Sequence, residues 1–332
     1  MPRATIAVVE LAEGYQLKDI SPRAYEHPAD RAATAALKAI PYVDSTVRRI
    51  IEFGYERALR RGILGSAVRL GDGQLADVHR AHERAFITLD MEPVPELYMT
   101  QHPLANAATI GSARPIVVVN SELVRLLDIE QLRGVFAHEA GHVLSDHVLY
   151  GTALVILTRL SILPGIPVPL FPLRTALMEW SRAAELSCDR AAALVIRDPL
   201  AICRTLMVLS AGGEAANLDL DVFIEQGREY REKSSGFDRL SRLLSDLNLT
   251  HPMSVQRVHE LISWVESGAY DRIVGGEYPR RDEPADVRAE AGDAVTHYSE
   301  RLRDTFRELA DSVEDAAKQL NDWLRRHRDD DE

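Results

Sequence analysis

The sequence predicts an α+β fold that is mainly α-helical and contains a small antiparallel sheet. Apolar residues recur three and four positions apart over several long segments, which is the spacing of a buried helix face. β-Branched runs bounded by proline and glycine lie close together between residues 95 and 120 and indicate short strands joined by turns. A charged segment with a heptad-like apolar pattern predicts a long helix at the C-terminus.

Composition and charge narrow the class of protein. Hydrophobic residues make up 46% of the 332 residues and charged residues 27%, as in soluble globular proteins. The formal net charge of −12 argues against nucleic-acid binding, because phosphate contacts need clustered Lys and Arg. The two cysteines, Cys188 and Cys203, suit a reducing compartment, and Glu10 and Glu13 interrupt the apolar core that a signal peptide needs. We therefore expect a cytoplasmic protein.

The chain divides into four predicted regions. Residues 1–89 form an N-terminal helical region, and residues 90–270 form a domain that includes the sheet. Residues 271–284 are a polar, turn-rich linker, and residues 285–332 are an amphipathic helix with an acidic end. Within these regions we expect helices over 33–40, 47–64, 74–89, 176–197 and 252–267, and strands over 67–70, 95–100, 106–111 and 116–120.

Residues 135–143 contain the pattern His138-Glu139-x-x-His142 inside a helical apolar stretch. On a helix, two histidines four positions apart share one face and can hold one metal ion. Neutral imidazoles suit Zn²⁺, and Glu139 is placed to take a proton from a metal-bound water. A chance match is the alternative, so the surrounding sequence has to decide.

Two features support a buried helix at this motif. Asp128 precedes the helix and Gln131 follows three positions later, which is the spacing of a capping box. Gly141 costs about 1 kcal/mol relative to alanine inside a helix. It therefore indicates that a second helix or a substrate backbone approaches closely at this position.

The predicted helix over 176–197 offers a third metal ligand. Glu185 and Asp189 stand four positions apart and share a face of a mostly apolar helix. Glu185 is the candidate third ligand, and Asp189 is the candidate acceptor for the second ring N–H of a ligating histidine. The alternative is a solvated acidic face that has no metal.

Taken together, these motifs resemble the M48 zinc metallopeptidases. The resemblance covers about residues 90–262, and the two paired motifs are highly specific in combination. The matching segments are His138-Glu139-x-x-His142, Ser181-Arg-x-x-Glu185-x-x-x-Asp189-x-x-Ala192, Asn106-Ala-x-x-x-Gly111, Ile116–Leu123, and Thr250-His251-Pro252 with Arg257.

The resemblance implies a gluzincin-like domain that holds one Zn²⁺ per chain. By resemblance, His138, His142 and Glu185 are the zinc ligands and Glu139 is the general base. Asp189 would accept a hydrogen bond from one of the ligating histidines. The implied activity is endopeptidase cleavage of protein or peptide substrates, with protein quality control as the expected setting. The alternative function is a non-proteolytic scaffold in which the metal is structural and the C-terminal helix binds a partner.

His251 and Arg257 are candidates for donors to the oxyanion that forms during peptide hydrolysis. His251 precedes Pro252 at a predicted helix start, so it is equally well explained as an ordinary residue near a helix cap. A third option is that His251 fills the open zinc position and inhibits the enzyme. A further expectation concerns residues 107–111, whose small side chains would let an extended peptide pair with an edge strand.

Two segments of the sequence suggest possible partners, namely a membrane surface for residues 153–173 and a second copy of the chain for residues 285–325. The apolar run over 153–173 contains Arg159 and four prolines, so it predicts a buried helix followed by an extended loop. Peripheral contact with the inner face of a membrane is the alternative, although the family's members HtpX and the CAAX prenyl protease carry clear transmembrane helices. The C-terminal helix either docks on its own domain or forms a homo-oligomer through residues 285–325.

Overall fold

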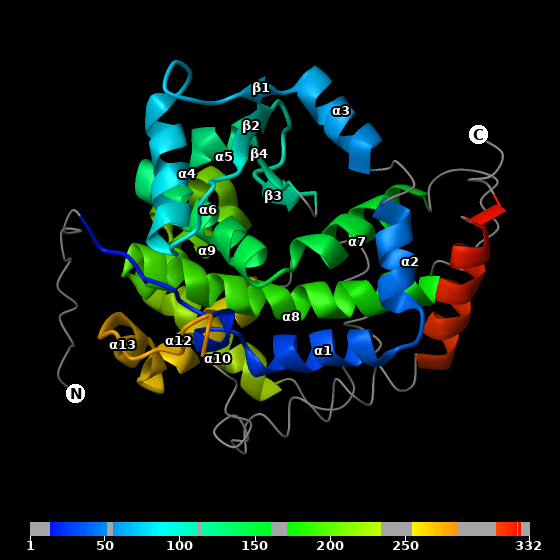
Figure 1. Ribbon diagram of the computed structural model, residues 1–332. Helices are drawn as coiled ribbons and strands as arrows, with labels where there is room; N and C mark the ends of the chain where they lie inside the picture. The colour runs from blue at the N-terminus through cyan, green and yellow to red at the C-terminus, as the bar shows by residue number, and fades with distance from the viewer. Residues whose placement is uncertain are drawn as a thin grey trace.

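The computed structural model describes residues 14–51, 56–111, 114–160, 171–233, 254–283, 310–323 and 325–326. The longest helix, α8 (Phe171–Ile196), runs through the middle of the molecule in Figure 1. Helix α6 (Ile129–Leu144) and the sheet lie on one side of α8, and α1 (Pro28–Ala39) lies on the other. Helix α8 is buried along most of its length because it serves two hydrophobic cores.

The larger core lies between the sheet, α6 and the second half of α8. Its helices are amphipathic, and their apolar faces meet in one continuous cluster. The other helices that contribute are α4 (Ala76–Thr88), α5 (Ser121–Leu126), α9 (Pro199–Ala211), α10 (Leu220–Lys233), α12 (Ser254–Glu266) and α13 (Ala269–Val274). This core therefore packs α6 against α8, α4, α9 and the sheet.

The sheet has four strands in the order β1-β2-β4-β3. These strands are β1 (Val68–Arg69), β2 (Glu96–Thr100), β3 (Ala107–Ile110) and β4 (Ile116–Asn120). β4 runs antiparallel to β3 but parallel to β2, with Glu96 opposite Ile116. The predicted antiparallel sheet is thus wrong, and the sheet is mixed.

The position of β3 explains the mixed sheet. β3 does not pair with β2; it forms the edge of the sheet beyond β4. β4 therefore lies between β2 and β3 and runs in the same direction as β2. Ile116, Val117 and Val119 of this central strand are buried. An unbroken apolar run is typical of parallel strands covered on both faces, so the sequence of β4 agrees with its observed place.

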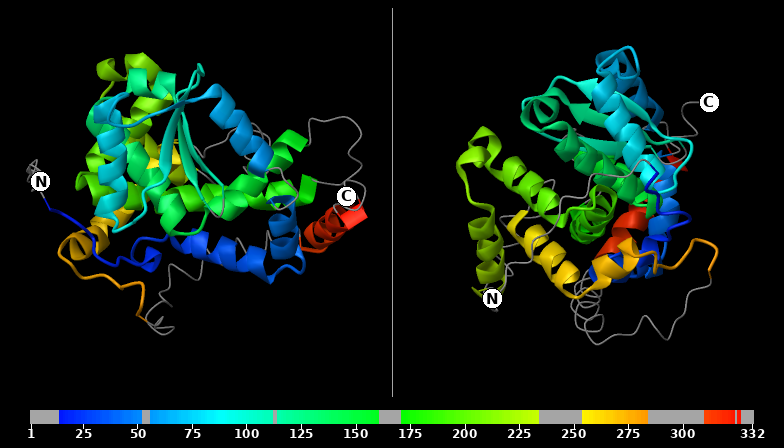
Figure 2. Two further views of the ribbon diagram at one scale, coloured as in Figure 1. Left: turned by 45° about the horizontal axis from the view of Figure 1, so that its top comes forward. Right: turned by 90° about the vertical axis from the view of Figure 1, so that its left-hand side faces the viewer.

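The smaller core packs the first half of α8 against α1, α2 (Val43–Ile50) and α7 (Val148–Leu160). Figure 2 shows α1 running along the side of α8 that faces away from the sheet, whereas α2 turns steeply away from α1 toward α7. Helix α3 (Glu56–Ser66) follows α2 within the stretch where we expected one helix over 47–64. Trp180 is the largest buried side chain here, and its indole N–H donates to Thr34 Oγ1 at 2.9 Å.

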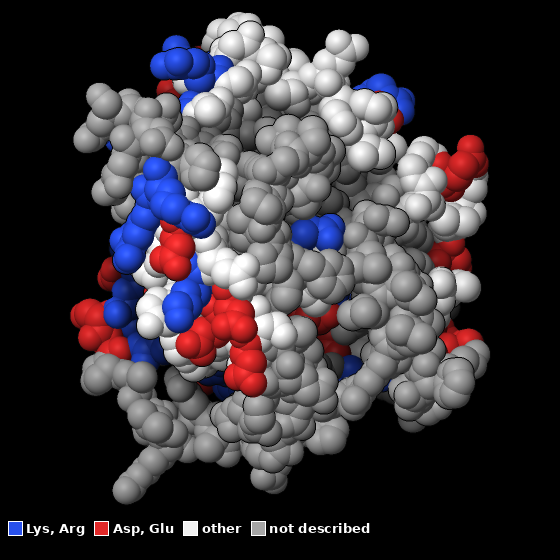
Figure 3. All heavy atoms as spheres, turned by 90° about the vertical axis from the view of Figure 1, so that its right-hand side faces the viewer, with Lys and Arg blue, Asp and Glu red and all other residues white. Residues whose placement is uncertain are grey.

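The described part of the C-terminal segment is a helix over 310–323 that packs on this smaller core. Val313, Ala316, Ala317 and Leu320 are buried, and the Thr46 hydroxyl donates to the Ala317 carbonyl at 3.0 Å. Its remaining positions are mostly polar and exposed, and acidic and basic side chains intermingle on the face shown in Figure 3. This segment therefore docks on its own chain; oligomer formation through 285–325 stays a prediction.

The apolar run over 153–173 begins in α7 and ends in α8, and residues 161–170 lie outside the described ranges. Within the described residues, no helix on its own is both long enough and apolar enough to span a membrane. Helix α6 and residues 148–158 reach that length and composition only as a pair, and they meet at an angle of 101°. Peripheral membrane contact stays a prediction.

Candidate metal centre

Helix α6 begins with the predicted capping box. The Asp128 carboxylate accepts from the Gln131 backbone N–H at 2.8 Å, and the Gln131 side chain accepts from the Asp128 backbone N–H at 3.1 Å. Buried residues such as Phe136 and Ala140 then fix the rotation of α6 about its axis. This rotation turns His138 and His142 toward α8.

Gly141 lets α6 and α8 approach closely. A Cβ atom at this position would lie 3.0 Å from the Ala191 Cβ and 3.3 Å from the Cys188 Cα. Both neighbours belong to or adjoin the backbone of α8, so neither can move aside cheaply. The close approach that we expected from the sequence is made by a second helix.

Three donor groups converge between the two helices. His138 Nε2 lies 3.2 Å from His142 Nε2 and 3.4 Å from Glu185 Oε2, and His142 Nε2 lies 3.2 Å from Glu185 Oε1. A tetrahedral zinc ion with bonds of about 2.0–2.1 Å separates neighbouring ligand atoms by about 3.3–3.4 Å. The donor set and its spacing therefore fit zinc.

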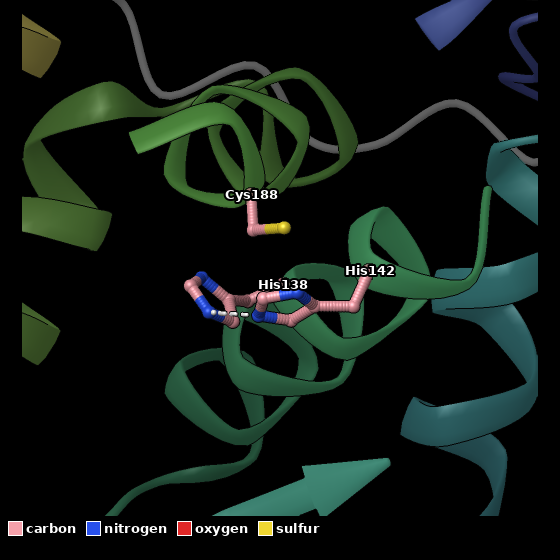
Figure 4. Close-up of side chains that lie close together, drawn as sticks. All are labelled: His138, His142 and Cys188. Carbon is pink, nitrogen blue, oxygen red and sulfur yellow. Dashed lines mark hydrogen bonds between the residues drawn. The ribbon is translucent and has the colours of Figure 1, made fainter. Parts of the chain in front are cut away.

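Cys188 lies close to the same two histidines. Figure 4 shows its side chain projecting from α8 toward the two imidazoles of α6, and its sulfur belongs to a compact group with both rings. Burial raises the pKa of the Cys188 thiol well above its ordinary value, and nearby carboxylates add to this effect. The Glu185 oxygens lie 3.2 and 3.4 Å from the two histidine Nε2 atoms, which is the spacing of zinc ligands, so the Glu185 carboxylate is the better third donor.

His138 has a carboxylate behind it. Asp189 Oδ1 lies 3.1 Å from His138 Nδ1, and Arg257 holds Asp189 through two hydrogen bonds of 2.5 and 2.7 Å. Burial alone would lower the pKa of His138, but Glu185 and Asp189 outweigh burial and raise this pKa to about 9. Arg257 also lies 3.0 Å from Glu185 Oε2, so one buried guanidinium contacts both carboxylates.

Glu139 points toward the sheet. Its Oε2 atom accepts a hydrogen bond of 2.7 Å from the Thr109 hydroxyl, and only 5% of Glu139 is exposed. Thr109 belongs to β3, which lies at the edge of the sheet. The carboxylate between the two histidines is thus fixed by the strand that we expected to bind a peptide.

His142 contacts a residue that the sequence did not single out. His147, in the turn after α6, places Nδ1 3.3 Å from His142 Nδ1 and Nε2 3.0 Å from Asp30 Oδ2. Asp30 comes from α1 and accepts a further hydrogen bond of 2.6 Å from the Ser187 hydroxyl. All three of His147, Asp30 and Ser187 are buried.

The structure places most of the predicted site residues together. His138, His142, Glu185, Glu139 and Asp189 form one buried cluster; Glu185 and Asp189 are only 3% and 2% exposed, which excludes a solvated acidic face. Arg257 lies behind Asp189 and Glu185, and His251 lies outside the described residues.

Sequence reasoning missed three contributors, namely Thr109, His147 and Asp30. A signal existed for His147, since it stands five positions after His142 and extends the motif. The sequence contained no comparable signal for Asp30 or Thr109.

Comparison with known proteins agrees with this geometry. Residues 72–265 match the sequence model of peptidase family M48. The chain is 33% identical over 283 residues to the plastoglobule-localized metallopeptidase 48 of Arabidopsis thaliana, an alignment that covers 82% of this chain and 81% of that protein. It is 25% identical over 207 residues to a protease HtpX homolog of Ralstonia nicotianae, covering 54% of this chain and 70% of that protein.

A second protease HtpX homolog, from Pelotomaculum thermopropionicum, is 44% identical over 62 residues, which cover 18% of this chain and 22% of that protein. No solved structure matches the chain. The family match covers more than half of the chain and includes α6, most of the sheet and the helix that carries Glu185. The chain therefore belongs to peptidase family M48 and is a metallopeptidase.

Proposed function

We propose that this metallopeptidase is a zinc-dependent endopeptidase. The observation that supports the proposal is the triangle of His138, His142 and Glu185 donor atoms, with the Glu139 carboxylate between the two histidines in sequence. A structural metal site needs no general base, whereas a hydrolytic site does. We propose one zinc ion per chain at this triangle.

When bound, zinc supplies a Lewis acid that lowers the pKa of water toward about 7 and polarises the scissile carbonyl. Glu139 takes a proton from the attacking water and later passes it to the leaving amine. The Thr109 hydroxyl holds one Glu139 oxygen at 2.7 Å and so limits the rotation of the carboxylate. Glu139 is therefore positioned before substrate arrives.

The edge strand β3 is the proposed binding site for the substrate backbone. β4 occupies one side of β3, and among the described strands none pairs with the other side. An extended peptide can add to such an edge through backbone hydrogen bonds. Because Thr109 lies on β3 and contacts Glu139, a peptide paired there would pass close to the general base.

Arg257 has a different proposed role from the oxyanion donor considered in the sequence. Its Nε and Nη2 atoms donate to Asp189, and its Nη1 atom contacts Glu185. We therefore propose that Arg257 positions these two carboxylates. For His251, a donor role, an inhibitory zinc contact and an ordinary capping role all remain predictions.

The first experiment combines zinc content with cleavage of casein, because protein quality control is the predicted setting. We expect about one zinc per chain and casein cleavage that is at least about 100-fold slower in Glu139→Gln, as expected for loss of a general base. Zinc content should be unchanged in this variant. Equal cleavage by wild type and Glu139→Gln, with zinc bound to both, would contradict the enzyme proposal and favour the scaffold.

A latched enzyme could also give a negative result, so His251→Ala is measured beside the wild type. Activity that rises in His251→Ala but disappears in His251→Ala/Glu139→Gln would support an endopeptidase inhibited by His251. Unchanged activity in His251→Ala would exclude both the oxyanion-donor role and the inhibitory zinc contact for this histidine.

A further inference from the structure

His147 is held in one orientation by its surroundings. Its backbone N–H donates to the His142 carbonyl at 2.9 Å, and its ring packs edge-on against Trp180 with centroids 5.5 Å apart. Asp146, the residue before it, has a φ of 57°, which turns the chain sharply between α6 and α7. Because only 4% of His147 is exposed, solvent contributes little to its hydrogen bonding.

The Asp30 carboxylate decides which His147 nitrogen carries a proton. Asp30 accepts from the Ser187 hydroxyl at 2.6 Å and from the Thr34 hydroxyl at 3.3 Å, and His147 Nε2 lies at 3.0 Å. A carboxylate only accepts hydrogen bonds, so His147 must present Nε2–H to Asp30. Neutral His147 then has a lone pair on Nδ1.

That lone pair faces His142. The two Nδ1 atoms are 3.3 Å apart, so His142 must donate Nδ1–H to His147. His142 Nε2 is then the unprotonated nitrogen, and this is the atom that points at His138 Nε2 and Glu185 Oε1. The Cys188 thiol, 3.7 Å from His147 Nδ1, is a weaker donor for the same lone pair.

We propose that Asp30 and His147 form a positioning relay that fixes the tautomer and the ring orientation of His142 for zinc binding. This inference rests on the proposed zinc site. The relay makes α1, which precedes the family-matched residues, part of the metal centre. It also gives the two zinc histidines unequal support, because His138 contacts the Asp189 carboxylate directly whereas His142 reaches Asp30 through an imidazole.

The first test is the tautomer itself, read from ¹⁵N imidazole shifts of the metal-free protein labelled with ¹⁵N-histidine. We expect His142 to carry its proton on Nδ1 in the wild type. In His147→Leu, which removes the acceptor, His142 should show a mixture of both tautomers. A wild-type His142 that is protonated on Nε2 would overturn the proposal.

The second test is zinc affinity, measured by competition with a chromophoric chelator. Loss of an outer hydrogen bond to a metal-ligating histidine lowers metal affinity by about 10–100-fold, and we expect a loss in this range for His147→Leu and Asp30→Leu. His147→Asn keeps an acceptor near the Nδ1 position and should recover part of the affinity. Affinity within twofold of wild type in both leucine variants would overturn the relay.

A double variant separates a relay from ordinary packing. If Asp30 acts through His147, then Asp30→Leu should weaken zinc binding no further in a His147→Leu background. A purely structural role predicts instead that each change lowers thermal stability while zinc affinity stays at the wild-type value. Thr46→Ala is the matched control, because it removes a buried hydrogen bond from the smaller core without removing a contact of Asp30 or His147; its zinc affinity should be near wild type.

The near-isosteric Asp30→Asn keeps the test usable if the leucine variants fail to fold. It keeps the volume of Asp30 and one acceptor oxygen, so it should fold and bind zinc with intermediate affinity. Failure of the endopeptidase proposal can be distinguished from failure of the relay. If only the endopeptidase proposal fails, zinc binds and the relay variants weaken zinc binding, but casein cleavage does not depend on Glu139.

Discussion

The two hydrophobic cores share α8 but differ in what they contribute to the site. The larger core contains α6 and the sheet, and the family-matched residues 72–265 include α6 and every strand except β1; this core supplies both histidines, Glu139 and Thr109. The smaller core packs α1, α2 and the helix over 310–323, which lie outside that match, against α7 and the first half of α8. It reaches the metal site through Asp30. The residues proposed for catalysis thus lie in the larger core, while the smaller core contributes Asp30, which contacts His142 through His147.

The strongest test of this contrast is Arg257→Met in the larger core. Removing one partner of a buried, hydrogen-bonded ion pair costs about 3–5 kcal/mol, because the carboxylates of Asp189 and Glu185 stay buried without their guanidinium partner. We expect this loss in the free energy of unfolding of the metal-free protein, measured with urea. Bound zinc should restore part of it, since zinc replaces the missing positive charge.

Arg228→Met is the control for a surface ion pair. Arg228 contacts Glu225 and Glu266 at 3.1 and 3.2 Å, but all three side chains are about half exposed. Such pairs contribute about 0–1 kcal/mol. A loss in Arg257→Met no larger than in this control would show that the buried guanidinium does not hold the ligand carboxylates.

Leu320→Ala tests the smaller core. Leu320 is fully buried in the helix over 310–323, and truncation of a buried leucine costs about 2–5 kcal/mol. Zinc affinity should nevertheless change less than twofold, because the Leu320 helix is bonded to α2 through Thr46, whereas the relay lies on α1 and in the turn after α6. A large drop in zinc affinity would show that the two cores are more tightly coupled than their contacts indicate.

His82 predicts a pH dependence that belongs to the larger core. Its ring packs against Phe86 and Phe136, and burial lowers its pKa from 6.5 to about 4 despite a hydrogen bond to the Pro95 carbonyl. The unfolded chain therefore takes up a proton at a higher pH than the folded chain. Stability from neutral His82 is fully present above pH 6.5 and declines as the pH falls toward 4, by about 3 kcal/mol.

The measurement compares wild type with His82→Gln, which keeps a donor for Pro95 but does not titrate. Both proteins contain the same remaining histidines, so the difference in their urea unfolding curves isolates His82. The advantage of wild type at pH 7 should shrink steadily as the pH falls to 4. Parallel pH profiles would contradict the lowered pKa.

The sequence predicted the parts of the site that depend on local spacing. The capping box at Asp128, the shared face of His138 and His142, and the close helix approach at Gly141 all follow from helix geometry. The strand positions were also close to those observed. The predicted antiparallel sheet was wrong, since β2 and β4 run parallel, because alternation reveals the faces of a strand but not its neighbours or their direction.

The relay shows a second reason for incomplete prediction. Asp30 stands at the start of a helix, where an acidic residue is expected simply from the helix dipole. Its contact with His147 arises from the packing of α1 on α8 and brings together residues that are far apart in the sequence. Local patterns carry no information about such contacts.

Two glycines give the smallest predicted effects, and these have opposite signs. An added methyl group at Gly141 would meet Ala191 and Cys188 at 3.0–3.3 Å, so Gly141→Ala should destabilise the protein by about 1–2 kcal/mol, despite the better helix propensity of alanine. At Gly151 in α7 a Cβ atom would meet nothing within 4 Å, so Gly151→Ala should stabilise by up to about 1 kcal/mol. Thermal unfolding measures both changes. Zinc affinity should fall only in Gly141→Ala, because the spacing between α6 and α8 sets the distance from the histidines to Glu185.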